Sequence, residues 1–102
     1  MATMIITTVT AMEAQAQASL FLSDRLPDRI SASTPSFDDA KAVWRVPVIL
    51  AYPFLGVLGQ VGEVVVSGTK AEVISATPAE EMLNAARTLA EKHRDEIEAP
   101  LP

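Results

Sequence analysis

The chain has 102 residues, of which 49% are hydrophobic, and its eight basic and thirteen acidic residues give a net charge of −5. This length predicts one domain over residues 1–102, and the absence of cysteine excludes disulfides and thiolate metal sites and suits a reducing cytoplasm. The acidic balance argues against nucleic acid as a partner, because binding to phosphates depends on clustered Lys and Arg, and it favours a basic protein partner.

The N-terminal residues 1–9 lack the basic segment and long apolar core of a signal peptide, and we expect a frayed tail or a short edge strand there. A helix should follow, because Thr10 and Glu13 have the spacing of a capping box. Its apolar stripe contains Ala11, Ala14, Ala18, Leu22 and Leu26. The small alanines would let this helix approach a sheet closely, and Pro27 should end it near residue 24 or 25.

The central part of the chain predicts a sheet. Residues 29–37 are weakly strand-like, and residues 36–39 are expected to turn into a strong strand over residues 42–52. In that strand the large apolar side chains fall at every second position and share one face: Trp44, Val46, Val48, Leu50 and Tyr52. Pro47 has no N–H for a ladder, so the strand should be an edge there or carry a bulge. Residues 53–59 should form a loop.

Residues 46–62 carry no charge over seventeen positions, which is close to the lower limit for a membrane-spanning helix. Prolines and glycines interrupt this stretch, and its first half alternates as a strand does. We therefore expect a soluble cytoplasmic domain that does not bind a membrane.

The C-terminal half predicts a hairpin and then a helix. Residues 62–67 and 71–75 read as strands joined by a tight turn at residues 68–70. Thr77 and Glu80 have the spacing of a second capping box, with Pro78 at the first helical position. The apolar face of that helix contains Ala79, Met82, Leu83, Ala86, Leu89, Ala90, His93 and Ile97. The expected fold is α+β, with a curled antiparallel sheet of about four strands packed with an N-terminal and a C-terminal helix.

Few residues point to chemistry. Gly56, Gly59 and Gly62 are spaced by three, but a phosphate-binding loop would lead into a helix, and these glycines lead into a strand, which favours simple loop geometry. His93 is the only histidine, so a site with several histidine ligands is excluded, and a packed or half-buried side chain is favoured over a pH-sensitive contact or a general base. We predict no catalytic, cofactor-binding or metal-binding residues, and no enzyme.

The candidate interaction residues are Phe54, Leu55, Val57 and Leu58, which make the predicted loop unusually apolar. Exposed together, they would exceed the scattered apolar residues normal on a monomer, so the loop is either a core lid or an interface. A strand edge at Pro47 next to such a loop favours a homodimer.

Residues 62–74, which read Gly-Glu-Val-Val-Val-Ser-Gly-Thr-Lys-Ala-Glu-Val-Ile, resemble the strand–turn–strand signature of PepSY-type domains. Those domains usually have Asp where this chain has Ser67 and Gly where it has Ala71. The run Trp-Arg-Val-Pro-Val at residues 44–48, the hairpin, and the Thr-Pro-x-Glu-Glu helix start are also similar to small uncharacterised bacterial proteins, some encoded beside PIN-type toxin nucleases. The resemblance implies a non-catalytic, antitoxin-like partner protein and identifies no functional residue. The basic DNA-binding segment of many antitoxins is not visible.

The sequence therefore predicts a non-enzymatic protein-interaction domain, and one alternative stays open. The alternative is a small-ligand-binding or enzymatic domain with its pocket beneath residues 53–59. An apolar loop without a polar cluster favours interaction, whereas His93 converging with carboxylates in a cleft would favour an enzyme.

Overall fold

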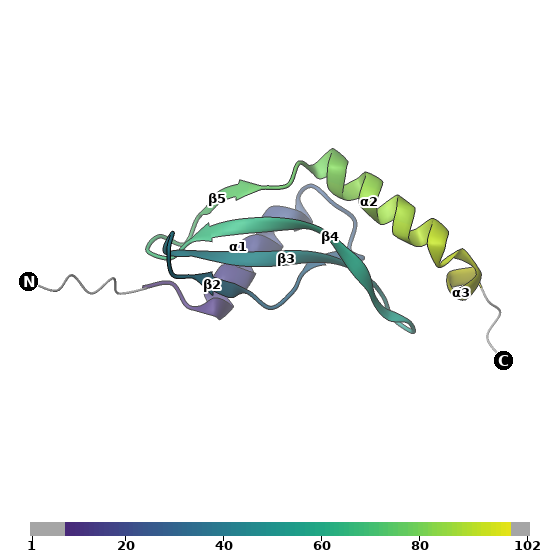
Figure 1. Ribbon diagram of the computed structural model, residues 1–102, viewed down its shortest axis with the longest axis horizontal. Helices are drawn as coiled ribbons and strands as arrows, with labels where there is room; N and C mark the ends of the chain where they lie inside the picture. Colours follow the sequence, from purple (N-terminus) through teal and green to yellow (C-terminus); the bar gives the residue numbers. More distant parts are fainter. Residues whose placement is uncertain (1–7, 99–102) are drawn as a thin grey trace, which may run out of the picture.

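The computed structural model describes residues 8–98 and shows the predicted α+β fold, a curled antiparallel sheet with helices from both ends of the chain (Figure 1). The elements in chain order are α1 (Ala11–Ser23), β1 (Ile30–Ala32), β2 (Ser36–Asp38), β3 (Val43–Tyr52), β4 (Gly56–Ser67), β5 (Val73–Ala76), α2 (Ala79–Lys92) and α3 (Arg94–Glu98). The strand order is β1-β3-β4-β5, and β2 also pairs with β3, so β1 and β2 follow one another along the same side of β3. The expectation for residues 1–9 falls largely on residues 1–7, outside the described part.

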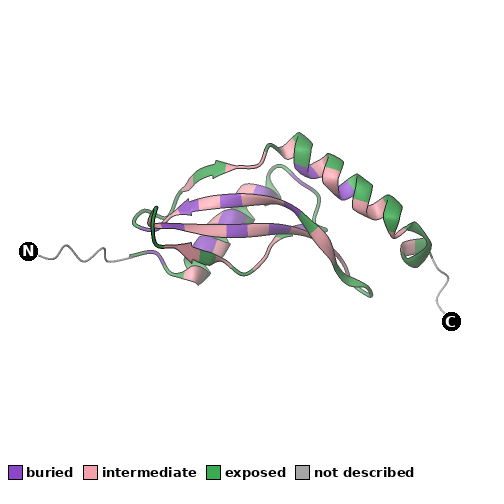
Figure 2. Ribbon diagram, in the orientation of Figure 1, coloured by how far each residue is buried: buried purple, intermediate pink, exposed green. Residues whose placement is uncertain are grey.

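The core lies between the inner face of the sheet and the helices. Val46, Val48 and Leu50 of β3 alternate with more exposed residues and form one cluster with both helices, as Figure 2 shows along the strands. α1 contributes Ala14, Ala18 and Leu22, and α2 contributes Met82 and Ala86. The period of two in β3 thus predicted the buried face correctly, with Trp44 and Tyr52 half-buried at its two ends.

The start of α1 follows the predicted capping box. The Glu13 N–H donates to the Thr10 hydroxyl at 3.1 Å, and the Thr10 N–H donates to a Glu13 carboxylate oxygen at 3.2 Å. Both bonds satisfy donors that the first helical turn leaves free. No helix within residues 8–98 is long and apolar enough to cross a membrane.

The predicted turn at residues 36–39 is wrong. Residues 36–38 form β2 and pair with residues 43–45, so the turn begins at residue 39. Two side chains of β2 explain the difference, because Phe37 and Asp38 each contact a side chain of β3. The Phe37 ring lies edge-on to Trp44 at 5.0 Å, and Asp38 accepts a hydrogen bond from Arg45.

Of the two alternatives for Pro47, the sheet edge is wrong, because β3 lies inside the sheet, and the bulge agrees with a register shift that follows just after this residue. Pro47 falls between the segments of β3 that pair with β1 and with β2, and its carbonyl accepts a hydrogen bond from the Ser33 N–H at 2.8 Å. The N and C=O of one strand residue point to the same side, so the missing N–H faces this interruption in the pairing. The register with β4 shifts just after it, between Val48 and Ile49.

The predicted loop over residues 53–59 is much shorter than expected. β4 begins at Gly56, so β3 and β4 form one long hairpin joined by residues 53–55, and its tip projects away from the body of the sheet (Figure 1). Gly56 has φ +77°, a conformation that suits glycine at a tight turn. Apolar residues after the turn therefore belong to a strand rather than to a lid.

The last helix differs from its prediction at both ends. The Thr77 hydroxyl accepts a hydrogen bond from the Glu63 N–H at 3.0 Å, and the Thr77 N–H donates to the Glu63 carbonyl at 2.9 Å. Because Thr77 extends the pairing with β4, Pro78 is the N-cap, and it has no side-chain capping bond. α2 ends at Lys92, His93 is its C-cap, and α3 follows as a separate short helix.

The turn geometry explains Gly56, whereas α2 explains Gly59 and Gly62. A Cβ atom added at Gly62 would lie 2.7 Å from Met82 Cγ, and one at Gly59 would lie 3.0 Å from Leu89 Cδ1. Met82 and Leu89 are seven residues apart and so share a helix face. The two glycines therefore let α2 approach β4 closely.

Candidate functional site

The tip of the β3–β4 hairpin carries three of the four predicted interaction residues on its surface. Phe54 is 86% exposed, Val57 60% and Leu55 38%. Leu58 is half-buried and packs against the core, so it is not part of an exposed patch. Leu58 is therefore part of the core, whereas the other three residues lie on the surface. Leu58 and Val57 differ because side chains alternate between the two faces of β4.

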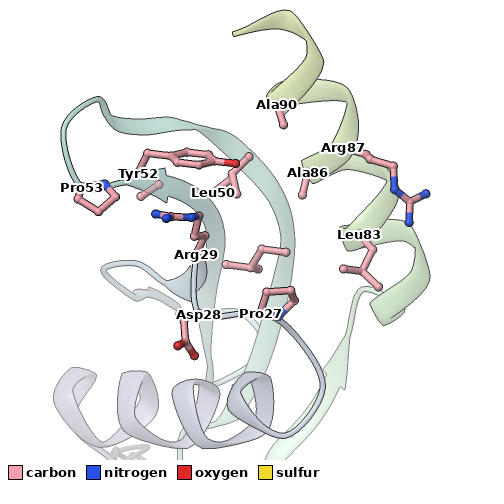
Figure 3. Close-up of a pocket in the computed structure, with 12 residues that line it drawn as sticks. Pro27, Asp28, Arg29, Leu50, Tyr52, Pro53, Leu83, Ala86, Arg87 and Ala90 are labelled. Carbon is pink, nitrogen blue, oxygen red and sulfur yellow. The ribbon is translucent and has the colours of Figure 1, made fainter. Parts of the chain in front are cut away.

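An open groove lies next to this tip, between the sheet and α2 (Figure 3). Its volume is about 830 Å³, within the range of small-ligand sites. One wall is formed by residues 27–30 and 50–53, and the other by Leu83, Ala86, Arg87 and Ala90. The groove reaches the protein core, because Ile30, Leu50 and Ala86 are buried. Sequence reasoning placed a pocket beneath residues 53–59, whereas most of this groove lies between β3 and α2.

Two smaller hollows extend the groove toward the tip and α3. One, of about 450 Å³, lies between Tyr52, α2 and α3. The other, of about 310 Å³, is lined by residues of both charges and by apolar residues: Arg29, Tyr52, Pro53, Phe54, Leu55, Glu96 and Ile97. Tyr52 lines all three spaces, so the exposed tip and the groove form one continuous surface.

Three charged residues line the groove, Asp28, Arg29 and Arg87, and the exposed Arg29 is the one whose side chain extends into the space. Its guanidinium lies over the Tyr52 ring, 4.5 Å from the centroid, and Figure 3 shows it between Tyr52 and Pro53. The same figure shows Asp28 and Arg87 pointing away from the groove, and Arg87 donates to the Asn84 side chain at 3.0 Å. In the described part of the chain, no carboxylate lies within ion-pair distance of Arg29.

His93 does not meet several carboxylates in a cleft. Its Nδ1 lies 3.2 Å from a Glu96 carboxylate oxygen within the same C-terminal turn, and its side chain is half-buried. Across residues 8–98, no group of three or more His, Asp or Glu residues is placed to hold a metal ion.

Sequence reasoning missed one charged cluster on the outer face of the sheet. Arg45 of β3 donates from Nε to Asp38 of β2 at 3.0 Å and from Nη1 to Glu63 of β4 at 2.8 Å. The hydrogen bond from Arg45 is the main reason that the pKa of Asp38 is lowered from its usual 3.8. Only the strand register brings these residues together, so no local sequence signal marked them.

Comparison with protein-family models, with curated proteins and with solved structures gave no match to this chain. The features of the molecule that bear on its function are therefore the hairpin tip, the groove and the charges around them.

Proposed function

We propose that this chain is a non-enzymatic protein-interaction domain that binds through the tip of the β3–β4 hairpin. The observation that carries the proposal is the exposure of Phe54, Leu55 and Val57 together at a projecting tip. Large apolar side chains grouped on a surface mark an interaction site more often than a free surface, because exposing them to water is costly.

A second copy of the chain is the partner that the tip suits best. Residues 46–62, which make up most of the hairpin, contain no charged residue. Two copies with a net charge of −5 each can therefore meet at this hairpin without placing like charges in contact. A two-fold arrangement would place the same apolar patch on both sides of the interface.

A basic protein is the other partner class that the charge supports. The net charge of −5 on the whole chain would attract it, in keeping with the antitoxin-like role that the resemblance implies. In both cases the tip supplies the apolar contact, and the partners differ in whether charge contributes.

The homodimer is tested by measuring molar mass by light scattering over a concentration series. The wild type is expected to approach twice the monomer mass at high concentration, and Phe54→Asp is expected to stay monomeric. Met12→Asp is the matched control, because Met12 is 81% exposed on α1, far along the chain from the tip. A wild type that is monomeric throughout would rule out the homodimer, and a loss of dimer in Met12→Asp would move the interface to α1.

The alternative class, a small-ligand-binding or enzymatic domain, is supported in its binding form by the groove of about 830 Å³. This observation concerns binding and indicates no reaction.

A further inference from the structure

We infer that the groove between β3 and α2 binds a small amphiphile, an apolar chain that ends in a carboxylate. The chain would lie along α2, and the carboxylate would meet Arg29 near the hairpin tip. This inference does not depend on the protein-interaction role of Phe54 and its neighbours.

The walls of the groove suit an apolar chain. Leu50 and Leu83 face the space from opposite sides, and Ala86 and Ala90 follow one another along the α2 wall (Figure 3). Because both alanine side chains are short, they fill little of the space between α2 and β3 and leave it open. A chain that displaces water from these surfaces binds more tightly with each methylene that it buries, by about two- to fourfold.

The charge inside the groove selects the head group. Arg29 is the one of the three charged residues labelled in Figure 3 whose side chain lies in the space, and stacking on Tyr52 holds it there. Its planar fork of N–H donors matches the two oxygens of a carboxylate. The chain as a whole has a net charge of −5 and repels anions. A preference for an anionic ligand therefore arises from Arg29 in the groove and not from the general surface.

The ligand class is tested by titration calorimetry with decanoate, below its micelle concentration. We expect saturable binding of one decanoate per chain. Decyltrimethylammonium has the same chain with the opposite charge and should bind at least about tenfold more weakly. Shortening the carboxylate should weaken binding by about two- to fourfold per methylene removed. Absence of saturable binding, or equal affinity for the anion and the cation, would overturn the inference.

The position is tested with a matched pair of arginine variants. Arg29→Gln should weaken decanoate binding about tenfold through loss of the charge-assisted contact. Arg25→Gln should leave binding unchanged, although Arg25 also stacks on an aromatic ring, 3.9 Å from the centroid of Phe21, because it does not line the groove. Equal effects of the two substitutions would overturn the assignment.

A third variant, Ala90→Leu, fills the groove without removing any charge. It should weaken decanoate binding, with an unfolding midpoint close to that of the wild type because its side chain enters open space. Unchanged decanoate affinity in a folded Ala90→Leu protein would place the ligand elsewhere.

Flotation with anionic phospholipid vesicles tests whether the ligand is a free amphiphile or a membrane surface. We expect no vesicle binding. Vesicle binding that depends on Arg29, without decanoate binding, would contradict the inference.

Discussion

At the scale of single residues, Arg45 shows how one side chain joins three strands. Its hydrogen bonds to Asp38 and Glu63 cross β3 from β2 to β4 on the outer face of the sheet. The bond to Asp38 favours the carboxylate form and lowers the pKa of that group in the folded chain. A carboxyl whose folded pKa is lowered stabilises the fold above its unfolded pKa, and this contribution is lost as the pH falls through the folded pKa.

The lowered pKa of Asp38 gives the first prediction, which concerns how stability depends on pH. Asp38→Asn should lower the urea midpoint at pH 7, where Asp38 is ionised, and the difference from the wild type should shrink as the pH falls below 3.8, the usual pKa of this group. Urea unfolding at pH 7 and at pH 3 measures both differences. Glu72→Gln, at an exposed position outside the cluster, serves as the control. A difference for Asp38→Asn that is the same at both pH values would show that the ion pair does not stabilise the fold.

At the scale of elements, the contact between α2 and β4 depends on residues that the sequence presented as two separate patterns. The spacing of Gly59 and Gly62 suggested a loop, and the apolar stripe of the helix included Met82 and Leu89. In the structure the two patterns meet, with Met82 packed over Gly62 and Leu89 packed over Gly59. Such a match is invisible in one sequence, because it depends on the crossing of a helix over a strand and not on local preference.

The second prediction tests this close approach. Gly62→Ala should destabilise the protein by about 1–3 kcal/mol, because the added Cβ would crowd buried Met82 and lie 2.9 Å from Thr77 Cβ. Gly59→Ala should cost less, because its neighbour Leu89 is half-exposed and can move aside. Free energies of unfolding in urea give the comparison. An equal or larger loss at Gly59 would contradict this packing.

The third prediction concerns the buried face of α2. Met82 is 1% exposed, so Met82→Ala should destabilise the protein by about 2–5 kcal/mol through lost burial and the cavity left behind. Its neighbour Glu81 is exposed, and Glu81→Ala should change stability by less than about 0.5 kcal/mol. If the two variants unfold at the same urea concentration, the assigned faces of the helix are wrong.

At the scale of the whole molecule, the sequence predicted the parts that depend on local chemistry. The period of two in β3 and the capping box of α1 both act within a few residues, and both are present. The errors at Pro47 and Thr77 have another origin, because each residue is decided by a partner strand. Pro47 lies inside the sheet where pairing on one side is interrupted, and Thr77 bonds to Glu63 instead of capping a helix.

The groove could not be predicted for the same reason. Its walls come from residues 27–30, the end of β3 and one face of α2, which are distant in sequence and meet only because the sheet curls. The exposed tip was partly visible, since four apolar residues followed Pro53. Only the structure separates Leu58, which packs inward, from Phe54 and Val57, which lie on the surface.

The proposal that the hairpin tip is the interaction surface is tested most directly by ¹H–¹⁵N correlation spectra over a dilution series. Self-association through the tip predicts concentration-dependent shifts concentrated at residues 52–58, with the amides of α1 unchanged. Spectra that do not change with concentration, or shifts confined to α1 around exposed Met12 and Leu20, would contradict it.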